Sequence, residues 1–300
     1  MLNSPKVLDA SQQSAIARLF SAAVVRELAS KGQSPLFSRL LIESDLIGSL
    51  KLSDSVSSAF ETAFLVLKKK PYRTEYSYKS AITNKLLLGR HSLKTATMLT
   101  EFRVETCKVD IAIFNGTSTA YEIKSERDRL QRLDNQLNSY RKLFAKIYVI
   151  TGENHAEEVL KSSHKETGIL LLSDRFSIST IREAIERPEK VSPEVICNSL
   201  QTKECIQILA EFGISPPMVP NTEIRSALLE IFRELDPAKV HSSMVKAVRH
   251  SRNSKTLVDF ISAIPRSLSA AAFSAPLKEK DHPRLLGALN TSIREALNWA

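Results

Sequence analysis

The run KVDIAIFNGTSTAYEIKS, residues 108–125, holds two β-rich segments on either side of Asn115-Gly116. Apolar residues suited to strands fill both segments, and Asn-Gly is a strong hairpin signal, so the run predicts a β-hairpin. Successive side chains of a strand point to opposite faces. The Asp110 side chain therefore points to the face opposite to that of its apolar neighbours. On the second strand, Glu122 and Lys124 likewise point to the face opposite to that of Tyr121 and Ile123.

The length of the turn decides whether the two carboxylates share a face. A two-residue loop of Asn115 and Gly116 would pair Asp110 with Tyr121 and send Glu122 to the other face. An odd-length loop, or a bulge at Gly116, pairs Asp110 with Glu122, and glycine supplies the left-handed residue that such loops require. We adopt the odd-length turn as a hypothesis.

Two neighbouring carboxylates and an amine indicate a metal and phosphate site. Like carboxylates repel unless a cation lies between them, and Mg²⁺ is commonly held by one or two carboxylates with water and phosphate. A charged lysine is no metal ligand, but Lys124 could contact a phosphate oxygen or orient the attacking water. The alternative is a surface ion pair between Glu122 and Lys124, worth about 0–1 kcal/mol.

A helix is expected to follow the hairpin, because Ser125 and Asp128 have the spacing of a capping box. Gln136 and Tyr140 are four residues apart, so both side chains can reach the same end of the sheet. The apolar strand 147–151 comes next. An apolar stripe with helical spacing lies in between, at Leu130, Leu133, Leu137, Tyr140 and Phe144.

The order Asp, Glu-x-Lys, Gln-x-x-x-Tyr resembles the PD-(D/E)XK nuclease superfamily, in its RecB and lambda-exonuclease-like branch. The parts stand at Asp110, 122–124 and 136–140. The run EIKSERDRLQRLDNQLNSYRKLF is similar to a poorly characterised bacterial family assigned to this superfamily. The resemblance implies an α/β (α+β) fold with a restriction-endonuclease-like core, in which helices flank a mixed central sheet.

The same resemblance implies a role for each matching residue. Asp110 and Glu122 would be metal ligands together with the backbone carbonyl of Ile123, and Lys124 would be the catalytic lysine. The metal would be Mg²⁺ or Mn²⁺. Gln136 and Tyr140 would position the substrate strand, and an upstream glutamate would complete the site. Glu101 and Glu105 lie in the predicted strand 100–106, and Glu75 is the alternative on a preceding helix. We favour Glu101.

Positive charge is concentrated just before the hairpin. The net charge is +9 with a pI near 9.4, and residues 66–108 hold ten Lys and Arg against three acids. A basic patch beside the site would gather nucleic-acid phosphate. We expect Lys79, Lys85, Arg90 and Lys94 to contact nucleic acid, and the resemblance implies that this nucleic acid is DNA. The string 249–255 could contact phosphate as well, or form a solvated loop.

The cellular compartment and the division into domains are predicted from weaker signals. Three scattered cysteines without a CxxC pair, no signal peptide and no long apolar run predict a cytoplasmic protein with no membrane segment. We expect three parts: a helical N-terminal region (1–92), the nuclease-like core (93–189) and a helical C-terminal region (190–300). The helical regions could bind a second copy or a protein partner.

These observations favour a magnesium-dependent nuclease that acts on DNA. The resemblance implies a role in phage defence or mobile-element biology. The alternative is a DNA-binding regulator or scaffold on the same fold that has lost turnover. A helical interaction module is a third hypothesis, which predicts no salt-sensitive binding of DNA.

Overall fold

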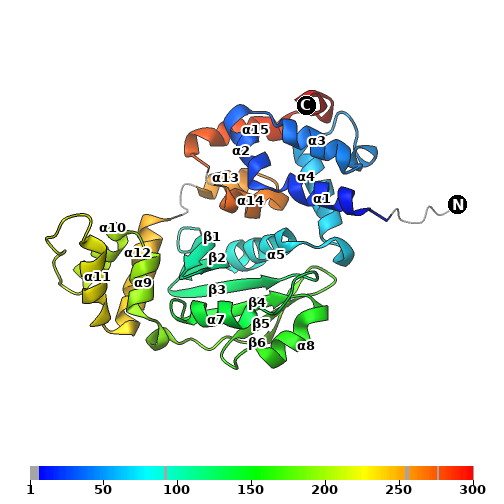
Figure 1. Ribbon diagram of the computed structural model, residues 1–300. Coiled ribbons are helices and arrows are strands. Elements are labelled where there is room, and N and C mark those ends of the chain that lie inside the picture. The colour runs from blue at the N-terminus through cyan, green and yellow to red at the C-terminus, as the bar shows by residue number, and fades with distance from the viewer. Residues whose placement is uncertain (1–6, 91–92, 254–256, 276, 300) are drawn as a thin grey trace. The chain divides into compact units, whose positions relative to one another are not determined.

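The computed structural model describes residues 7–90, 93–253, 257–275 and 277–299. The chain forms two compact units (Figure 1). The first combines residues 1–84 with 256–300, and the second comprises residues 85–255.

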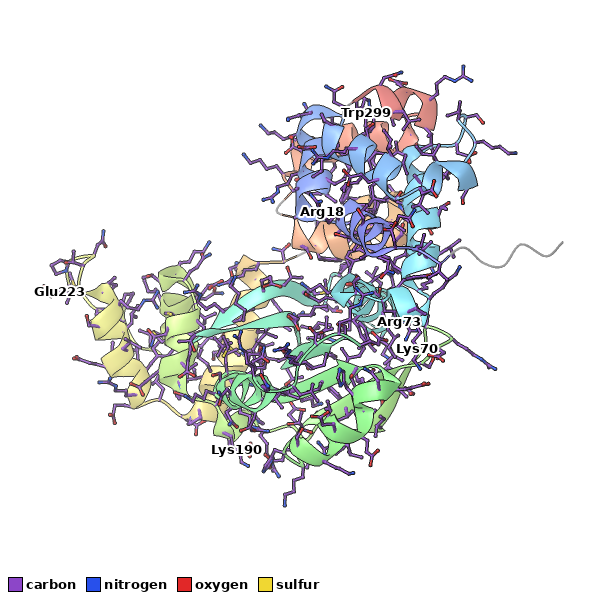
Figure 2. The ribbon with its side chains drawn as sticks, turned by 45° about the vertical axis from the view of Figure 1, so that its right-hand side comes forward. Arg18, Lys70, Arg73, Lys190, Glu223 and Trp299 are labelled. Atoms are coloured by element: carbon purple, nitrogen blue, oxygen red, sulfur yellow. The ribbon has the colours of Figure 1, made fainter. Side chains whose placement is uncertain are left out.

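The first unit is helical and has an aromatic core. Phe60 lies between Phe20 and Phe37, at centroid distances of 5.6 and 5.2 Å. Trp299 near the C-terminus packs 6.1 Å from Phe37 (Figure 2), so both ends of the chain contribute to one core. Its α-helices are α1 (Ala10–Leu19), α2 (Ala22–Lys31), α3 (Pro35–Glu43), α4 (Val56–Leu67), α5 (Glu75–Ala81), α13 (Val258–Ala263), α14 (Ser269–Ser274), α15 (His282–Asn290) and α16 (Ile293–Ala296).

The second unit contains a mixed six-stranded sheet within its described residues, in the order β1-β2-β3-β4-β5-β6. The β1–β2, β2–β3 and β5–β6 pairs are antiparallel, whereas β3–β4 and β4–β5 are parallel. The expected α+β class, with helical regions at both ends of the chain, is therefore confirmed. The strands are β1 (Thr97–Val104), β2 (Cys107–Asn115), β3 (Thr117–Lys124), β4 (Lys146–Thr151), β5 (Gly168–Leu172) and β6 (Ile178–Arg182).

Helices connect the parallel strands and cover the sheet (Figure 1). The crossover helices are α7 (Leu133–Arg141), between β3 and β4, and α8 (Glu153–Ser162), between β4 and β5. Phe114 of β2, Tyr140 of α7 and Met244 of α12 belong to one buried core, which joins the sheet to the helices after it. Those helices are α9 (Pro193–Ser199), α10 (Thr202–Glu211), α11 (Ile224–Arg233) and α12 (Pro237–Ser251). The short segments Ile82–Leu87 (a π-helix) and α6 (Leu88–Arg90) precede β1.

The hairpin turn has the odd length that the site requires. Asn115 pairs with Thr117 and Ile111 with Tyr121, so the register places Asp110 opposite Glu122. Gly116 at the turn has φ +69°, a left-handed conformation that glycine adopts without strain. The hypothesis of an odd-length turn at Gly116 is thus confirmed.

The expected helix start at Ser125 is wrong. The Asp128 carboxylate accepts from both the backbone N–H and the hydroxyl of Ser125, at 2.7 and 2.6 Å. These bonds close a local turn, and α7 begins only at Leu133. Aspartate has a shorter side chain than the glutamate or glutamine of a capping box, and its bonds to Ser125 stabilise the turn without a helix following.

The compact units do not follow the three-part division. Residues 190–255 pack with the sheet, whereas 256–300 pack with the N-terminal helices. Val56 N–H donates to Thr291 O at 2.9 Å, which is one of the contacts that join the distant segments of the first unit. No described helix has both the length and the apolar character needed to cross a membrane.

Candidate metal and nuclease site

Four of the predicted residues form one hydrogen-bonded cluster at the end of β3. Lys124 Nζ donates to Glu122 Oε1 at 2.8 Å and to Gln136 Oε1 at 3.0 Å. The Tyr140 hydroxyl lies 2.8 Å from Glu122 Oε2. Glu122 and Lys124 come from β3, and Gln136 and Tyr140 from one side of α7, as their four-residue spacing predicts.

The cluster is buried, which excludes the surface ion pair considered above. Glu122 is 1% exposed and Lys124 is 7% exposed. Burial raises the pKa of the Glu122 carboxyl, and the opposing influences are the charge of Lys124 and the hydrogen bonds from Lys124, Tyr140 and Gln136. Two charges removed from water need well-placed partners, because the desolvation cost is several kcal/mol per ion.

The Tyr140 hydroxyl faces two oxygens with a single proton. It lies 2.7 Å from the carbonyl oxygen of Lys108 and 2.8 Å from Glu122 Oε2. Burial, followed by the negative charge of Glu122, raises the pKa of Tyr140, so the phenol stays protonated.

Asp110 and Glu101 form a second pair of carboxylates beside this cluster. Asp110 Oδ2 accepts from the backbone N–H of Ile123 at 2.7 Å, which ties the carboxylate to β3 between Glu122 and Lys124. In the β1–β2 register Glu101 lies opposite Asp110, and their carboxylate oxygens are within 4.8 Å of each other. Asp110 is half-buried, and Glu101 is exposed.

Glu101 has an unusual backbone for a strand residue. Its φ is +53°, although it lies inside β1. A left-handed residue other than glycine, asparagine or aspartate costs roughly 1–2 kcal/mol. Such strain often occurs at functional sites, where the surrounding structure imposes it.

The donor set fits a hard divalent cation. Mg²⁺ binds oxygen ligands at about 2.1 Å, so two of them lie at most about 4.2 Å apart, which a small adjustment of Glu101 and Asp110 achieves. Among the described residues, Glu122 is not part of the group of mutually close carboxylate oxygens that includes those of Glu101 and Asp110. Its two oxygens contact Lys124 Nζ and the Tyr140 hydroxyl, so Glu122 would reach the same ion only after a side-chain movement, through a second lone pair. Ile123 contributes its N–H to Asp110, and its carbonyl is the backbone group that sequence analysis assigned to the metal.

Glu75 and Lys79, two other predicted residues, lie on α5 in the first unit. Lys79 Nζ is 2.6 Å from Glu75 Oε1, and the Lys79 side chain is only 13% exposed. Glu75, the alternative upstream glutamate, is thus already partly neutralised by a cation. The ion pair also makes Lys79 a weaker candidate for phosphate binding than an exposed lysine.

The other predicted DNA contacts lie in the second unit. Lys85, Arg90 and Lys94 are all exposed. Lys85 Nζ lies 6.0 Å from the centroid of the Phe176 ring, in the β5–β6 turn. Lys94 lines a hollow together with residues of α12, a neighbour that its place in the sequence did not reveal.

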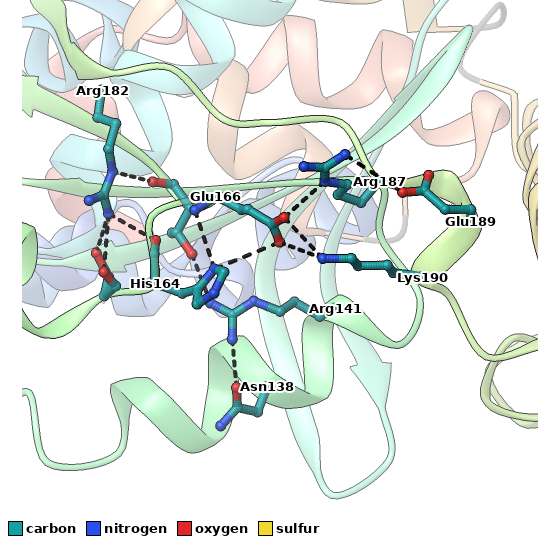
Figure 3. Close-up of polar contacts among 10 residues, drawn as sticks. Asn138, Arg141, His164, Glu166, Arg182, Arg187, Glu189 and Lys190 are labelled. Carbon is teal, nitrogen blue, oxygen red and sulfur yellow. Dashed lines mark hydrogen bonds and ion pairs between the residues drawn. The ribbon is translucent and has the colours of Figure 1, made fainter.

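A charged network around Glu166 was missed by sequence analysis (Figure 3). Glu166 Oε1 lies 2.9 Å from Arg187 Nε and 3.0 Å from Lys190 Nζ. The hydrogen bond from Lys190 is the main cause that lowers the pKa of Glu166 to about 2. The adjoining cavity, which Arg141 also lines, measures only about 30 Å³. Arg187 and Lys190 follow β6, so their bonds to Glu166 fasten this part of the chain to the core.

Comparisons with known proteins place the chain in a family. The family model of bacteriophage P4 protein cII matches residues 68–271, which is 204 of the 300 residues. Protein cII of Enterobacteria phage P4 is 28% identical over 185 residues, covering 59% of this chain and 67% of that protein. A protein of unknown function from Silicibacter pomeroyi matches with a TM-score of 0.31 and 21% identity, over 41% of this chain and 80% of its own. From the extent of the family match, the chain belongs to the bacteriophage P4 protein cII family.

Proposed function

We propose that this protein is a metal-dependent nuclease that hydrolyses phosphodiester bonds in DNA, on a restriction-endonuclease-like core and in the cytoplasm. One observation carries the proposal: Glu122, Lys124, Gln136 and Tyr140, singled out by their spacing, form one bonded cluster. Asp110 is tied to the same strand through the N–H of Ile123. A phage relative supports a setting in mobile-element biology or phage defence.

Each residue has a distinct task in this mechanism. Asp110, Glu122 and Glu101, with the Ile123 carbonyl, would hold Mg²⁺ or Mn²⁺, which supplies Lewis acidity at the scissile phosphate. Lys124, fixed between Glu122 and Gln136, directs its ammonium at the attacking water or a phosphate oxygen. Tyr140 holds Glu122 from the side opposite to Lys124.

The proposal is tested by cleavage and binding assays on two variants. In Glu122→Gln the amide oxygen can still accept from Lys124 and the amide nitrogen can donate to Tyr140, so the fold persists while a metal ligand is lost. Lys124→Gln removes the ammonium and leaves buried Glu122 without its cation. If Glu122 stays charged, this lowers the free energy of unfolding by about 3–5 kcal/mol. We expect wild-type protein to cleave DNA with Mg²⁺ or Mn²⁺ and both variants to bind DNA without cleaving it.

The control is Glu157→Gln, which removes a carboxylate of α8 that is 80% exposed and should leave cleavage unchanged. Linear, circular and single-stranded DNA and RNA are each offered with and without metal. If no form is cleaved by wild-type protein, while DNA binding is the same for wild type and both site variants, the nuclease proposal fails. The non-catalytic DNA-binding regulator or scaffold then takes its place.

A further inference from the structure

Helix α12 presents a row of cations on the face that does not pack against the core. Lys239, Lys246 and Arg249 share this face with Ser242, because the intervals are three, four and three residues. Lys239 and Lys246 are exposed and Arg249 is half-buried. At 1.5 Å per residue the row from Lys239 to Arg249 is about 15 Å long. We call these three cations the α12 row.

Two hollows lie along the α12 row and share Lys246. The first, of about 430 Å³, is lined by Lys239, Ser242 and Lys246 with Glu211 and Phe212 from the end of α10. The second, of about 230 Å³, brings Lys94 and the start of β1 against Lys246, Arg249 and His250. None of the described residues that line the second hollow is acidic.

Most of this charge is not neutralised by the protein. Among the described residues, Lys239 and Arg249 form no ion pair. Lys246 Nζ does pair with Glu211 Oε2 at 2.9 Å, which makes Glu211 the acid in the first hollow. Arg252 differs, because it donates to both oxygens of buried Glu204 at 2.7 and 2.6 Å and so has a structural role.

The end of α12 is anchored near the candidate site. The Arg252 guanidinium lies 5.6 Å from the centroid of the Phe102 ring. Phe102 directly follows Glu101 in β1. Arg252, at the end of α12, therefore lies close to the residue that follows Glu101 in β1.

We propose that the α12 row, together with Lys94, binds the phosphate backbone of a nucleic-acid strand and holds it against the second unit. The inference rests on the proposed function for the identity of the ligand and extends it to a surface outside the carboxylate site. One B-DNA strand has a phosphate every ~3.4 Å along the axis, so a 15 Å row spans about four phosphates. A linear array of cations fits such a backbone better than a single small anion. Of the string 249–255, which could contact phosphate, Arg249 and His250 line the second hollow. Arg252 instead has the structural role described above. Ser254 and Lys255 lie outside the described residues.

The test measures the binding of a labelled DNA duplex by fluorescence anisotropy, without divalent metal, over a range of salt concentrations. The double variant Lys239→Gln with Arg249→Gln should lower affinity roughly thirtyfold at 0.15 M salt, because each lost phosphate contact reduces the log–log salt slope by about 0.9. The matched control is Lys165→Gln with Arg175→Gln, which removes one exposed lysine and one exposed arginine beside β5. The control should change affinity less than threefold.

A third variant reverses the sign of the effect. Glu211→Gln keeps an acceptor for the Ser243 hydroxyl and releases Lys246, so it should tighten DNA binding. Equal losses in the double variant and its control, or no salt-dependent binding by wild-type protein, overturn the inference. The inference is also overturned if the double variant loses binding to anionic lipid vesicles while its DNA binding is unchanged. This test is independent of the nuclease proposal, because Glu122→Gln should abolish cleavage and leave DNA binding by the α12 row intact.

Discussion

At the scale of single residues, the backbone of Glu101 connects strain with the metal site. Glu101 and Glu105 both have left-handed φ values, +53° and +52°, but only Glu101 lies opposite Asp110. Glu105 lies at the tight turn between Val104 and Cys107, where its carboxylate pairs with Lys142. A turn readily explains the conformation of Glu105, whereas the interior of a strand does not explain that of Glu101.

Replacing Glu101 with glycine should raise stability and abolish the response to metal. Glycine relieves the left-handed strain, so the free energy of unfolding should rise by about 1 kcal/mol in a chelator. Wild-type protein should gain thermal stability with Mn²⁺, because a ligand that binds only the folded state stabilises it, and Glu101→Gly should not. Thermal unfolding with and without Mn²⁺ measures both effects.

Glu105→Gly is the matched control, since it relieves the same strain and should keep the metal response. Glu75→Gln decides between the two upstream glutamates. If Glu75→Gln removes the response to Mn²⁺ and Glu101→Gly retains it, the assignment of the third carboxylate moves from Glu101 to Glu75.

At the scale of elements, α12 is fastened to the hairpin by a buried histidine. His241 Nε2 lies 2.8 Å from Ser118 Oγ, which also accepts from the N–H of Ala145 at 3.1 Å. Ser118 or His241 can be the donor of the bond between them, depending on the tautomer of the imidazole. Burial lowers the pKa of His241 to about 4, and the charge of Glu186 only partly opposes this shift.

Because His241 is neutral in the folded protein, the free energy of unfolding depends on pH. In the unfolded chain His241 takes up a proton near pH 6.5, whereas in the folded protein it resists protonation down to about pH 4. Stability is therefore complete above pH 6.5 and falls as the pH drops toward 4, by at most about 3 kcal/mol. His241→Gln should flatten denaturant-derived stability over this range, while exposed His250→Gln should not. Parallel pH profiles for wild type and His241→Gln would contradict the assignment.

The same elements show how far sequence reasoning reaches. Alternation and the glycine at position 116 are local signals that predicted the hairpin but left two registers open, and the odd-length turn was a hypothesis adopted because it sets Asp110 opposite Glu122. Helical spacing predicted that Gln136 and Tyr140 reach the same end of the sheet, and the resemblance implied that they join Glu122 and Lys124 in one site. The positive φ of Glu101 could not be predicted, since it depends on its neighbours in the sheet. The start of α7 was misplaced because Ser125 and Asp128 can close a turn as well as cap a helix.

At the scale of the whole molecule, two separate cores explain why the expected domain division differs from the observed units. The helices after residue 255 have the same amphipathic character as those before it, so their pattern does not indicate which core they join. Phe60 is fully buried in the aromatic core of the first unit. Phe114 is fully buried in the second, 6.0 Å from the ring centroids of Phe102 and Phe144.

Two cores predict two unfolding transitions that respond to different mutations. Phe60→Ala and Phe114→Ala each remove a buried ring and leave a cavity, which costs about 3–5 kcal/mol in the unit concerned. For units of this size each substitution should lower the midpoint of its own transition by roughly 10 °C, and calorimetry of the full chain measures both. Because the carboxylates Asp110 and Glu122 and the α12 row belong to the second unit, only Phe114→Ala should weaken DNA binding at temperatures just below the lower midpoint. A single transition that both substitutions shift equally would mean that the two cores unfold as one cooperative body.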